Sequence, residues 1–378
     1  MTGIAIVADD LTSAGDGAAP FRDAGFPAVV MLADGPRRPG VTAVDIDTRA
    51  RPVAEAARRS ARAAAAYAGA DVLVKTIDST LRGHLVAEVE AALSTSGRHT
   101  AVVAPAFPGQ GRTTVSGVQH VEGRPVDQTW FARDPVHPIR SADLCELFPG
   151  AVLSTQVANL VGAAQYIVGD AVTDRDLDLL VAAVPRAEEV LWVGSPGLAA
   201  ALARHLAPQA SAANPAVVLE AASRLLVVAG SLNPATDRQL TRLGAATGSR
   251  PVQAADTDAV ERARRLLARH GMAILCGPRH RIDGAPVPAT LARATAQLEQ
   301  SRAFDALVLT GGETARTVLL ALGARSIALA GELEPGIPLG LIEGPQPLPV
   351  VIKAGGFGDP GTLVRLHNRL TMTSERLP

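Results

Sequence analysis

The sequence predicts an α/β protein of two domains, each a mostly parallel sheet with flanking helices. Short apolar runs alternate with helical patterns along the chain, and its 378 residues are enough for two or three domains. Leu206–Glu220 has two prolines, small polar residues and no periodicity, as linkers do. We therefore expect an N-terminal domain over residues 1–213 and a C-terminal domain over residues 214–378.

Continuous apolar runs predict the strands of the N-terminal half, because strands of a sheet covered on both faces are apolar throughout. The predicted strands are Ile4–Ala8, Ala28–Leu32, Thr42–Asp47, Asp71–Val74, Thr100–Ala104, Gln165–Val168 and Val190–Val193. Helical patterns run from Thr12 to Ala24, from Pro52 to Tyr67, from Leu85 to Leu93, over Arg175–Val184 and from Gly197 to His205. Pro105–Thr114 is rich in proline and glycine and predicts a shaped loop, and Val118–Phe131 predicts a hairpin around Gly123.

The C-terminal half contains one arrangement three times: a strand, a glycine-containing turn and a helix. The strands are Leu225–Ala229, Ala306–Leu309 and Pro349–Ile352; the turns begin at Gly230, Thr310 and Lys353; the helices run from Pro234 past Leu240, to Leu322, and over Thr362–Leu370. Glycine lets the backbone approach a ligand, and a helix N-terminus favours anions. Three such turns in one domain predict a site for a di- or triphosphate.

The composition excludes several classes of partner. A net charge of −1 argues against nucleic acid as the main ligand. The N-terminus has no basic segment typical of a signal peptide, and no apolar run has transmembrane length. Cys145 and Cys276 lie far apart without metal-ligand spacing, as suits a reducing compartment. We expect a cytoplasmic protein without a membrane partner.

The stretch Lys75–His84 follows a predicted strand and precedes a helix, so it lies at the carboxyl edge of the sheet, where open α/β folds bind ligands. Its polar residues are Lys75, Asp78, Ser79, Thr80, Arg82 and His84. Only two of the 36 basic residues are lysines, Lys75 and Lys353, which favours a specific use of the compact ammonium group. The alternative is an ion pair between Lys75 and Asp71 or Asp78.

Asp9 and Asp10 end the first predicted strand. A carboxylate there can hold a metal, accept a proton or bind a sugar hydroxyl, or Asp10 can simply cap the following helix. Arg49 falls at the same edge, where its guanidinium suits a carboxylate ligand unless it pairs with Asp47. Weaker candidates are Gln110, Arg112, Thr113, Arg133 and His137.

Familiar nucleotide motifs do not explain the glycine turns. Gly356-x-Gly358-x-x-Gly361 matches the dinucleotide fingerprint, but Pro360 interrupts it and no acidic residue follows at the required distance. Neither lysine belongs to a Walker A sequence, and no zinc-protease or esterase motif occurs. The residues alone fit a phosphoryl-transfer enzyme and, equally, a two-domain dehydrogenase.

Several stretches together resemble the four-carbon acid sugar kinases and span nearly the whole chain in the family's order. They are IAIVADDLTSAGDGA, KTIDSTLRGH, APAFPGQGRTT, FARDP, VVAGSLNPAT, LTGGETA, EPGIPLG and KAGGFGDPGTL. The resemblance implies an N-terminal domain that binds an acid sugar such as threonate, erythronate or an oxo-tetronate. It also implies a C-terminal domain that binds ATP. The Lys75–Gly83 segment looks more like the threonate and erythronate branch.

Carried over residue by residue, the resemblance implies two sets of contacts. The substrate-binding residues are Asp10, Arg49, Lys75, Thr76, Ile77 and Asp78, to which we add Ser79 and Arg82 of the same turn. The nucleotide-binding residues are Ser231, Gly311, Gly312, Glu313, Thr314, Gly355, Gly356, Phe357 and Gly358. His84 stands where the family has Asn, and Asp127-Gln128 where it has a His-Glu type pair, two departures that bear on substrate choice.

The resulting hypothesis is an ATP-dependent kinase that phosphorylates a hydroxyl of a four-carbon sugar acid. Lys75, Asp10 and Asp78 are the expected catalytic residues, and either aspartate is a candidate for the base. Arg49 and Arg82 are expected to hold the substrate carboxylate, and Mg²⁺ to bridge the phosphates of ATP. The alternatives are an NAD(P)-linked oxidoreductase of a sugar acid and a non-catalytic acid-sugar sensor. A homo-oligomer is compatible with each.

Overall fold

The computed structural model describes residues 3–33, 35–134, 137–154, 157–207, 217–280, 286–343, 347–372 and 375–377. The chain forms two compact units, Met1–Asn214 and Pro215–Pro378. The boundary predicted between residues 213 and 214 lies outside the described residues. Each unit is an α/β structure with a large, mostly parallel sheet, so the predicted fold class is confirmed.

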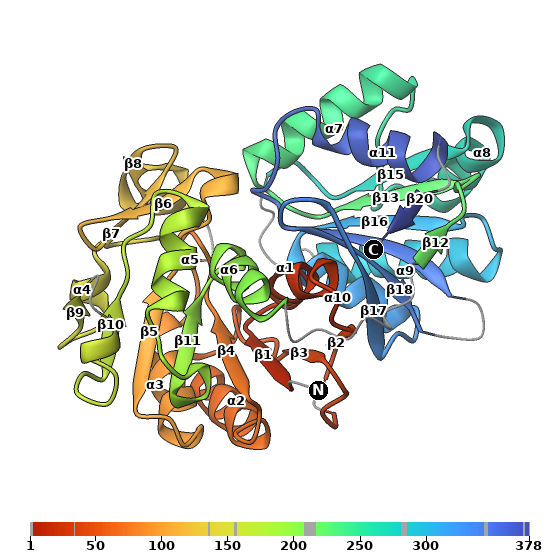
Figure 1. Ribbon diagram of the computed structural model, residues 1–378. Helices are drawn as coiled ribbons and strands as arrows, with labels where there is room; N and C mark the ends of the chain where they lie inside the picture. Colours follow the sequence, from red (N-terminus) through yellow and green to blue (C-terminus); the bar gives the residue numbers. More distant parts are fainter. Residues whose placement is uncertain are drawn as a thin grey trace. The chain divides into compact units, whose positions relative to one another are not determined.

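The sheet of the first unit has the strand order β2-β3-β1-β4-β11-β5-β10-β9, and every neighbouring pair is parallel (Figure 1). Its strands are β1 (Ile4–Ala8), β2 (Ala28–Met31), β3 (Val41–Asp45), β4 (Val72–Thr76), β5 (Thr100–Ala104), β9 (Val152–Leu153), β10 (Tyr166–Val168) and β11 (Val190–Gly194). The central strands are buried along their whole length. Their sequences are therefore continuous apolar runs rather than alternations of apolar and polar residues.

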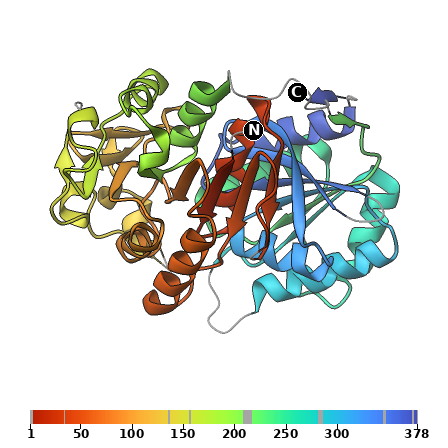
Figure 2. The same ribbon diagram turned by 60° about the horizontal axis from the view of Figure 1, so that its bottom comes forward.

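Helices cover both faces of this sheet, and Figure 2 shows them from a second side. They are α1 (Leu11–Asp23), α2 (Val53–Ala66), α3 (Leu85–Thr95), the short α4 (Leu144–Leu147), α5 (Asp174–Ala182) and α6 (Pro196–Leu206). Apolar residues of α2 and α3 share a core with alternate residues of β1, β4 and β5. On α1, a Cβ at Gly17 would lie 3.1 Å from a methyl group of Thr76, so glycine lets this helix approach β4 closely.

The sheet of the second unit has the order β14-β15-β13-β16-β19-β18-β17. Its strands are β13 (Leu225–Ala229), β14 (Val252–Gln253), β15 (Met272–Cys276), β16 (Ala306–Thr310), β17 (Ser326–Glu334), β18 (Ile337–Ile342) and β19 (Leu348–Lys353). The first five strands in that order are parallel, and β18 pairs antiparallel with both β19 and β17. A separate antiparallel pair joins β12 (Val217–Leu219) to β20 (Glu375–Leu377).

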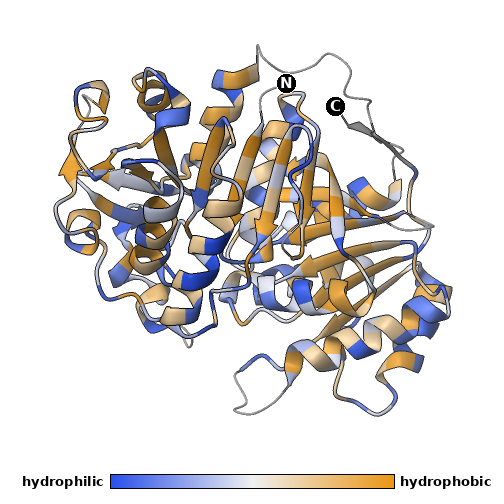
Figure 3. Ribbon diagram, turned by 90° about the horizontal axis from the view of Figure 1, so that it is seen from below, coloured by the Kyte–Doolittle hydropathy of each residue, from blue (hydrophilic) through white to orange (hydrophobic). Residues whose placement is uncertain are grey.

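The helices of the second unit are α7 (Pro234–Thr247), α8 (Ala259–His270), α9 (Val287–Gln300), α10 (Gly312–Ala321) and α11 (Thr362–Met372). Leucines of α7 and α11 pack with β13, β15 and β19 in one core. Figure 3 shows that the strands are mainly hydrophobic and that polar residues gather on the helices. No helix in the described part of the chain is both long and apolar enough to cross a membrane.

Two sequence predictions for the segment after β5 were wrong in detail. The stretch expected to be only a loop contains a short 3-10 helix at Pro108–Gln110 and strand β6 (Arg112–Val115), which pairs with β7 (Val118–Val121). Ser116 and Gly117 both have positive φ and make the tight turn between them. The hairpin around Gly123 exists, but it ends at β8 (Arg124–Pro125), and Phe131 lies in a 3-10 helix.

Candidate functional site

The sheet order of the first unit brings three predicted segments to one edge. Strands β3, β1 and β4 are adjacent and parallel, so Arg49, Asp9 with Asp10, and Asp78 follow neighbouring strand ends. The backbone N–H of Thr48 donates to the carbonyl of Asp9 at 2.9 Å, which fixes the loop after β3 against the end of β1. The edge predicted from sequence therefore contains a real cluster of charged side chains.

Arg49 is the centre of this cluster. Its Nε and Nη2 donate to the two carboxylate oxygens of Asp9 at 2.7 and 3.0 Å, Nη1 pairs with Asp10, and Nη2 also reaches Ser13 Oγ at 3.0 Å. Burial works to lower the pKa of Arg49, but Asp10, Asp9 and Asp78 raise it well above its usual value. The alternative pairing with Asp47 was wrong, because Asp47 pairs with Arg51 and Arg59.

Asp10 has two roles in the structure. One carboxylate oxygen accepts from the Ser13 N–H and the Thr12 hydroxyl, each at 2.8 Å, so Asp10 caps α1 as the simpler interpretation expected. The other oxygen faces Arg49. Asp9 is more deeply buried than Asp10. Burial works to raise the pKa of Asp9, but Arg49 and Lys75 hold it below its usual value.

Asp78 lies between the two arginines. Arg82 Nε donates to its Oδ2 at 2.5 Å, Arg49 Nη1 lies 3.9 Å from the same oxygen, and Thr80 donates to Oδ1. Burial works to raise the pKa of Asp78, but the two arginines and the Thr80 N–H together hold it well below its ordinary range. Arg82 also lies 3.7 Å from Asp134, a residue that the sequence analysis did not single out.

Lys75 belongs to β4 rather than to the following turn, because that strand continues to Thr76. Its Nζ lies 2.8 Å from Glu88 Oε2 and donates to the Thr76 carbonyl, and the side chains of Lys75 and Glu88 are only 1% and 2% exposed. Pairing with Asp71 or Asp78 was therefore wrong. Glu88 lies one helical turn after Leu85 on the predicted apolar face of α3. Because a buried carboxylate needs an opposite charge, a glutamate in this position indicates that a cation is buried beside it.

The other predicted residues lie around this cluster in different ways. Thr76, Ile77 and Ser79 are buried, and the hydroxyls of Thr76 and Ser79 have no partner among the described residues. His84 and His137 stack edge to face at 5.6 Å, and His84 Nε2 lies 2.6 Å from the Arg51 carbonyl. Arg112 is buried in β6, Gln110 and Thr113 are partly exposed, and Arg133 is exposed.

In the second unit the three glycine turns meet. A Cβ on Gly355 would lie 2.0 Å from Ser231 Oγ, and one on Gly311 would lie 3.4 Å from the Ser231 side chain. Gly311 has φ of +100°, which favours glycine, and its N–H donates to the Lys353 carbonyl. A Cβ on Gly230 would likewise lie 2.0 Å from Thr314 Oγ1. Gly312, Glu313 and Thr314 then form the first turn of α10.

The carbonyl groups of the third turn are held by side chains of the same unit. Thr236 Oγ1 donates to Gly355, Gln239 Nε2 to Phe357 and Asp359, and Lys353 Nζ to Ala354 and Phe357. The carbonyl oxygens are thus turned toward the protein, which suits a turn whose other side meets an anion. Burial lowers the pKa of Lys353 to about 7, which Glu334 opposes.

Comparison with known proteins decides the family. A sugar-binding N-terminal domain matches residues 4–202, and a nucleotide-binding C-terminal domain matches residues 226–363. A D-threonate kinase of Bordetella bronchiseptica is 37% identical over 96% of both chains. The chain belongs to the four-carbon acid sugar kinase family. A D-threonate kinase of Cupriavidus necator is 34% identical over 99% of both chains. A 3-oxo-tetronate kinase of Methylobacterium radiotolerans is 29% identical over 93% of this chain and 95% of its own.

Solved structures resemble this sugar-acid kinase along its whole length. A Salmonella typhimurium protein covers 98% of this chain and 100% of its own with a TM-score of 0.78, and at 21% identity it shows the shared fold alone. A Bordetella bronchiseptica protein is 34% identical over 100% of both chains with a TM-score of 0.50. That protein was crystallised with bound citrate as a domain-swapped dimer.

Gly355→Ala is expected to weaken ATP binding at least about tenfold, which corresponds to about 1.4 kcal/mol. The new methyl group would need the space of Ser231 Oγ, 2.0 Å away, so the turn must shift. Equilibrium binding of ATP by calorimetry measures the effect. Gly69→Ala is the control, because a Cβ there meets nothing within 4 Å. Equal ATP affinity in the Gly355→Ala variant and the wild type would show that this turn does not contact ATP.

The burial of Lys353 predicts a pH-dependent stability. Because its pKa falls from 10.5 to about 7, the folded state binds fewer protons than the unfolded state between these values. Stability from this group therefore rises with pH across that window, by at most about 1.4 kcal/mol per pH unit, and is flat below it. Denaturant unfolding of wild type and Lys353→Met at several pH values measures the difference. A constant difference from pH 7 to pH 10 would contradict the prediction.

Proposed function

We propose that the chain transfers the γ-phosphoryl group of ATP to a hydroxyl of a four-carbon sugar acid, with D-threonate as the first candidate. The observation that carries the proposal is the full-length similarity to a D-threonate kinase, 96% of both chains. The carboxylate and arginine cluster of the first unit and the glycine turns of the second supply the two kinds of binding group that the reaction requires.

Asp10 is our proposed base. Its Oδ2 pairs with Arg49 alone among the described residues, whereas Asp78 is held by two arginines and has a lowered pKa. A carboxylate with a lowered pKa accepts a proton poorly, so Asp78 suits a hydroxyl-binding role better. Lys75 is proposed to act from its buried position on the electrostatics of this edge, since it lowers the pKa of Asp9.

The substrate carboxylate is proposed to share Arg82 and Arg49 with the aspartates that hold them in the structure. Arg82 is the better placed, because its side chain is 23% exposed and it already stacks on Phe131 at 5.3 Å. Asp10, Asp78 and Ser79 are then proposed to bind hydroxyl groups, with Thr76 and the Ile77 backbone lining the site. This division gives the substrate carboxylate positively charged partners and gives its neutral hydroxyl groups hydrogen-bonding partners.

Mg²⁺ is proposed to arrive with the phosphates of ATP. Among the described residues, no group of three or more His, Cys, Asp or Glu side chains is arranged to hold a metal ion. Magnesium in kinases takes one or two carboxylates plus phosphate oxygens, and Glu313 in the first turn of α10 offers such a carboxylate. Ser231, Gly311, Gly312, Thr314 and Gly355–Gly358 are proposed to bind the phosphates.

Release of ADP from Mg-ATP tests the function with D- and L-threonate, D- and L-erythronate and the 3-oxo-tetronates. We expect turnover with one member of the panel and its loss when EDTA is added. Folded protein that binds ATP but is silent with every acid would overturn the substrate class. Protein that binds NADH and not ATP would favour the oxidoreductase instead.

We further propose that the enzyme forms a homo-oligomer and acts in the cytoplasm, where its phosphoryl donor is found. The oligomer is supported by the Bordetella protein that crystallised as a domain-swapped dimer. Light scattering coupled to gel filtration measures the mass directly. A mass of 38.9 kDa, that of one chain, would overturn it.

A further inference from the structure

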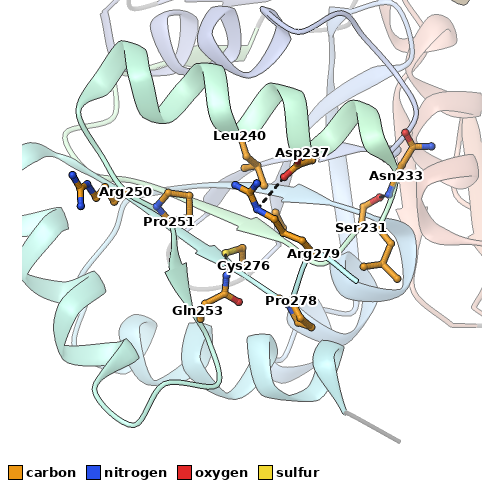
Figure 4. A pocket seen from close by; sticks show the side chains of 13 residues that line it. Ser231, Asn233, Asp237, Leu240, Arg250, Pro251, Gln253, Cys276, Pro278 and Arg279 are labelled. Atoms are coloured by element: carbon orange, nitrogen blue, oxygen red, sulfur yellow. Dashed lines mark hydrogen bonds and ion pairs between the residues drawn. The ribbon is translucent and has the colours of Figure 1, made fainter. Parts of the chain in front are cut away.

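Two histidines beside the carboxylate and arginine cluster, His84 and His137, are not used by any step of the proposed reaction. The cavity of about 310 Å³ in the second unit, by contrast, is lined by Ser231, a proposed phosphate contact, and so belongs to the nucleotide side of that reaction (Figure 4). The histidines come from two different segments of the first unit, and both contact the turn that carries Arg49. Their contacts therefore bear on the residue at the centre of the cluster.

The Arg49 turn, residues 47–51, is fixed at its first end by β1. The N–H groups of Thr48 and Arg49 both donate to the Asp9 carbonyl, at 2.9 and 3.3 Å. The Arg51 N–H then donates to the Thr48 carbonyl at 2.9 Å and closes the turn. These bonds fix where the turn begins, but they leave the direction of the Arg51 carbonyl to another contact.

Gly83 and His84 provide that contact from the turn after β4. His84 Nε2 lies 2.6 Å from the Arg51 carbonyl oxygen. Because a carbonyl only accepts, His84 carries a proton on Nε2 and donates it to this bond. Gly83, with φ of +99°, passes so close to the cluster that a Cβ there would lie 3.2 Å from Asp9 Oδ2 and 3.9 Å from Arg49 Cγ. Two consecutive residues after β4 therefore contact the Arg49 turn.

His137 supports the ring of His84 from the other side. The two rings pack edge to face, with their centroids 5.6 Å apart and their planes at 90°. The backbone N–H of His137 donates to Asp134 Oδ1 at 2.9 Å, and Asp134 Oδ2 lies 3.7 Å from Arg82 Nη1. Burial, the charge of Arg49 and the neighbouring His84 lower the pKa of His137. The His137 ring is therefore neutral at neutral pH and adds no positive charge beside the two arginines.

We propose that His84 is a positioning residue of the acid-sugar site: its Nε2–H fixes the Arg51 carbonyl and so keeps the Arg49 guanidinium where the substrate carboxylate binds. The inference rests on the proposed kinase function and adds a residue to its substrate side. The length of the side chain at position 84 is decisive. Glutamine has its amide nitrogen as many bonds from Cα as Nε2 of histidine, whereas the nitrogen of asparagine, the residue of the family pattern, is one bond short of this contact.

Three variants of His84 test the proposal: His84→Gln keeps a donor at the length of Nε2, and His84→Asn and His84→Met do not. Steady-state kinetics are measured with D-threonate, or with the acid of the panel that the wild type converts, and calorimetry measures ATP affinity. We expect KM for the acid to rise about three- to tenfold in His84→Asn and His84→Met, the effect of losing one hydrogen bond of ordinary net strength. Both kcat and ATP affinity should stay within about twofold of the wild type, because the lost contact acts on acid binding alone. His84→Gln should match the wild type, as should the control His120→Met, whose ring contacts the Val118 carbonyl of its own strand.

Hydrogen exchange of the backbone amides in residues 47–51 measures the Arg49 turn without any substrate. We expect these amides to exchange at least about threefold faster in His84→Met and His84→Asn, and at the wild-type rate in His84→Gln. A wild-type KM in His84→Met, an equal rise of KM in His84→Gln and His84→Met, or unchanged exchange in all three variants would overturn the positioning role. A wild type that converts none of the acids would instead overturn the kinase function, and the exchange rates would still decide whether His84 fixes the turn.

Discussion

Asp10→Asn is expected to lower kcat by about 10²–10⁴-fold, the usual contribution of a general base. Asparagine keeps the oxygen that caps α1 through the Ser13 N–H, so the helix start is preserved. It replaces the oxygen that faces Arg49 with an amide group, which neither accepts from the guanidinium nor takes a proton. Steady-state ADP release and ATP affinity, measured together, test the prediction; ATP affinity should stay within about twofold.

Asp47→Asn is the matched control for this variant. Asp47 lies after β3 near the same edge, but its carboxylate pairs with Arg51 and Arg59 rather than with Arg49. We expect its kcat to equal that of the wild type. Asp78→Asn is expected to raise KM more than it lowers kcat, because Asp78 is proposed to bind a hydroxyl. If Asp78→Asn loses kcat and Asp10→Asn does not, the two roles are exchanged.

The sequence predicted the strands well where the apolar runs were short and sharply bounded. Ile4–Ala8, Thr100–Ala104 and Leu225–Ala229 form strands with the same limits as predicted. Local information was enough there, because a buried parallel strand is apolar on both faces. The hairpin of β17 and β18 was missed. Its register shifts between Leu329 and Gly331 and again between Glu332 and Glu334, which breaks the regular alternation expected of an antiparallel strand.

The strand pattern also predicted where the candidate site lies, but it did not predict which charged side chains pair with each other there. Parallel strands place their carboxyl ends at one edge, so Asp10, Arg49 and Asp78 were expected near each other. Which carboxylate Arg49 meets depends on the loop after β3, where Asp47 has φ of +51° and the Thr48 N–H binds Asp9. That turn directs Arg49 toward the end of β1, and no sequence pattern encodes the strand order that makes this end its neighbour.

Lys75 and Glu88 give the second large prediction. Their ion pair is almost fully buried, so removing either charge leaves the other without compensation in a medium of low dielectric. Lys75→Met and Glu88→Met are each expected to lower the free energy of unfolding by about 3–5 kcal/mol. The double variant, with both charges replaced by apolar side chains of similar size, is expected to recover most of that stability. Denaturant unfolding of the four proteins measures this coupling.

The double variant also distinguishes a structural role of Lys75 from a catalytic one, because it is expected to recover stability while it still lacks the ammonium group. If Lys75 acts on the substrate edge through its charge, the stable double variant loses kcat by at least about tenfold, since the ammonium that lowers the pKa of Asp9 is gone. If the lysine only fills the core, the double variant turns over like the wild type. Activity that returns together with stability would therefore assign the scarce lysine of β4 to folding and leave Asp10 and the arginines to perform the reaction.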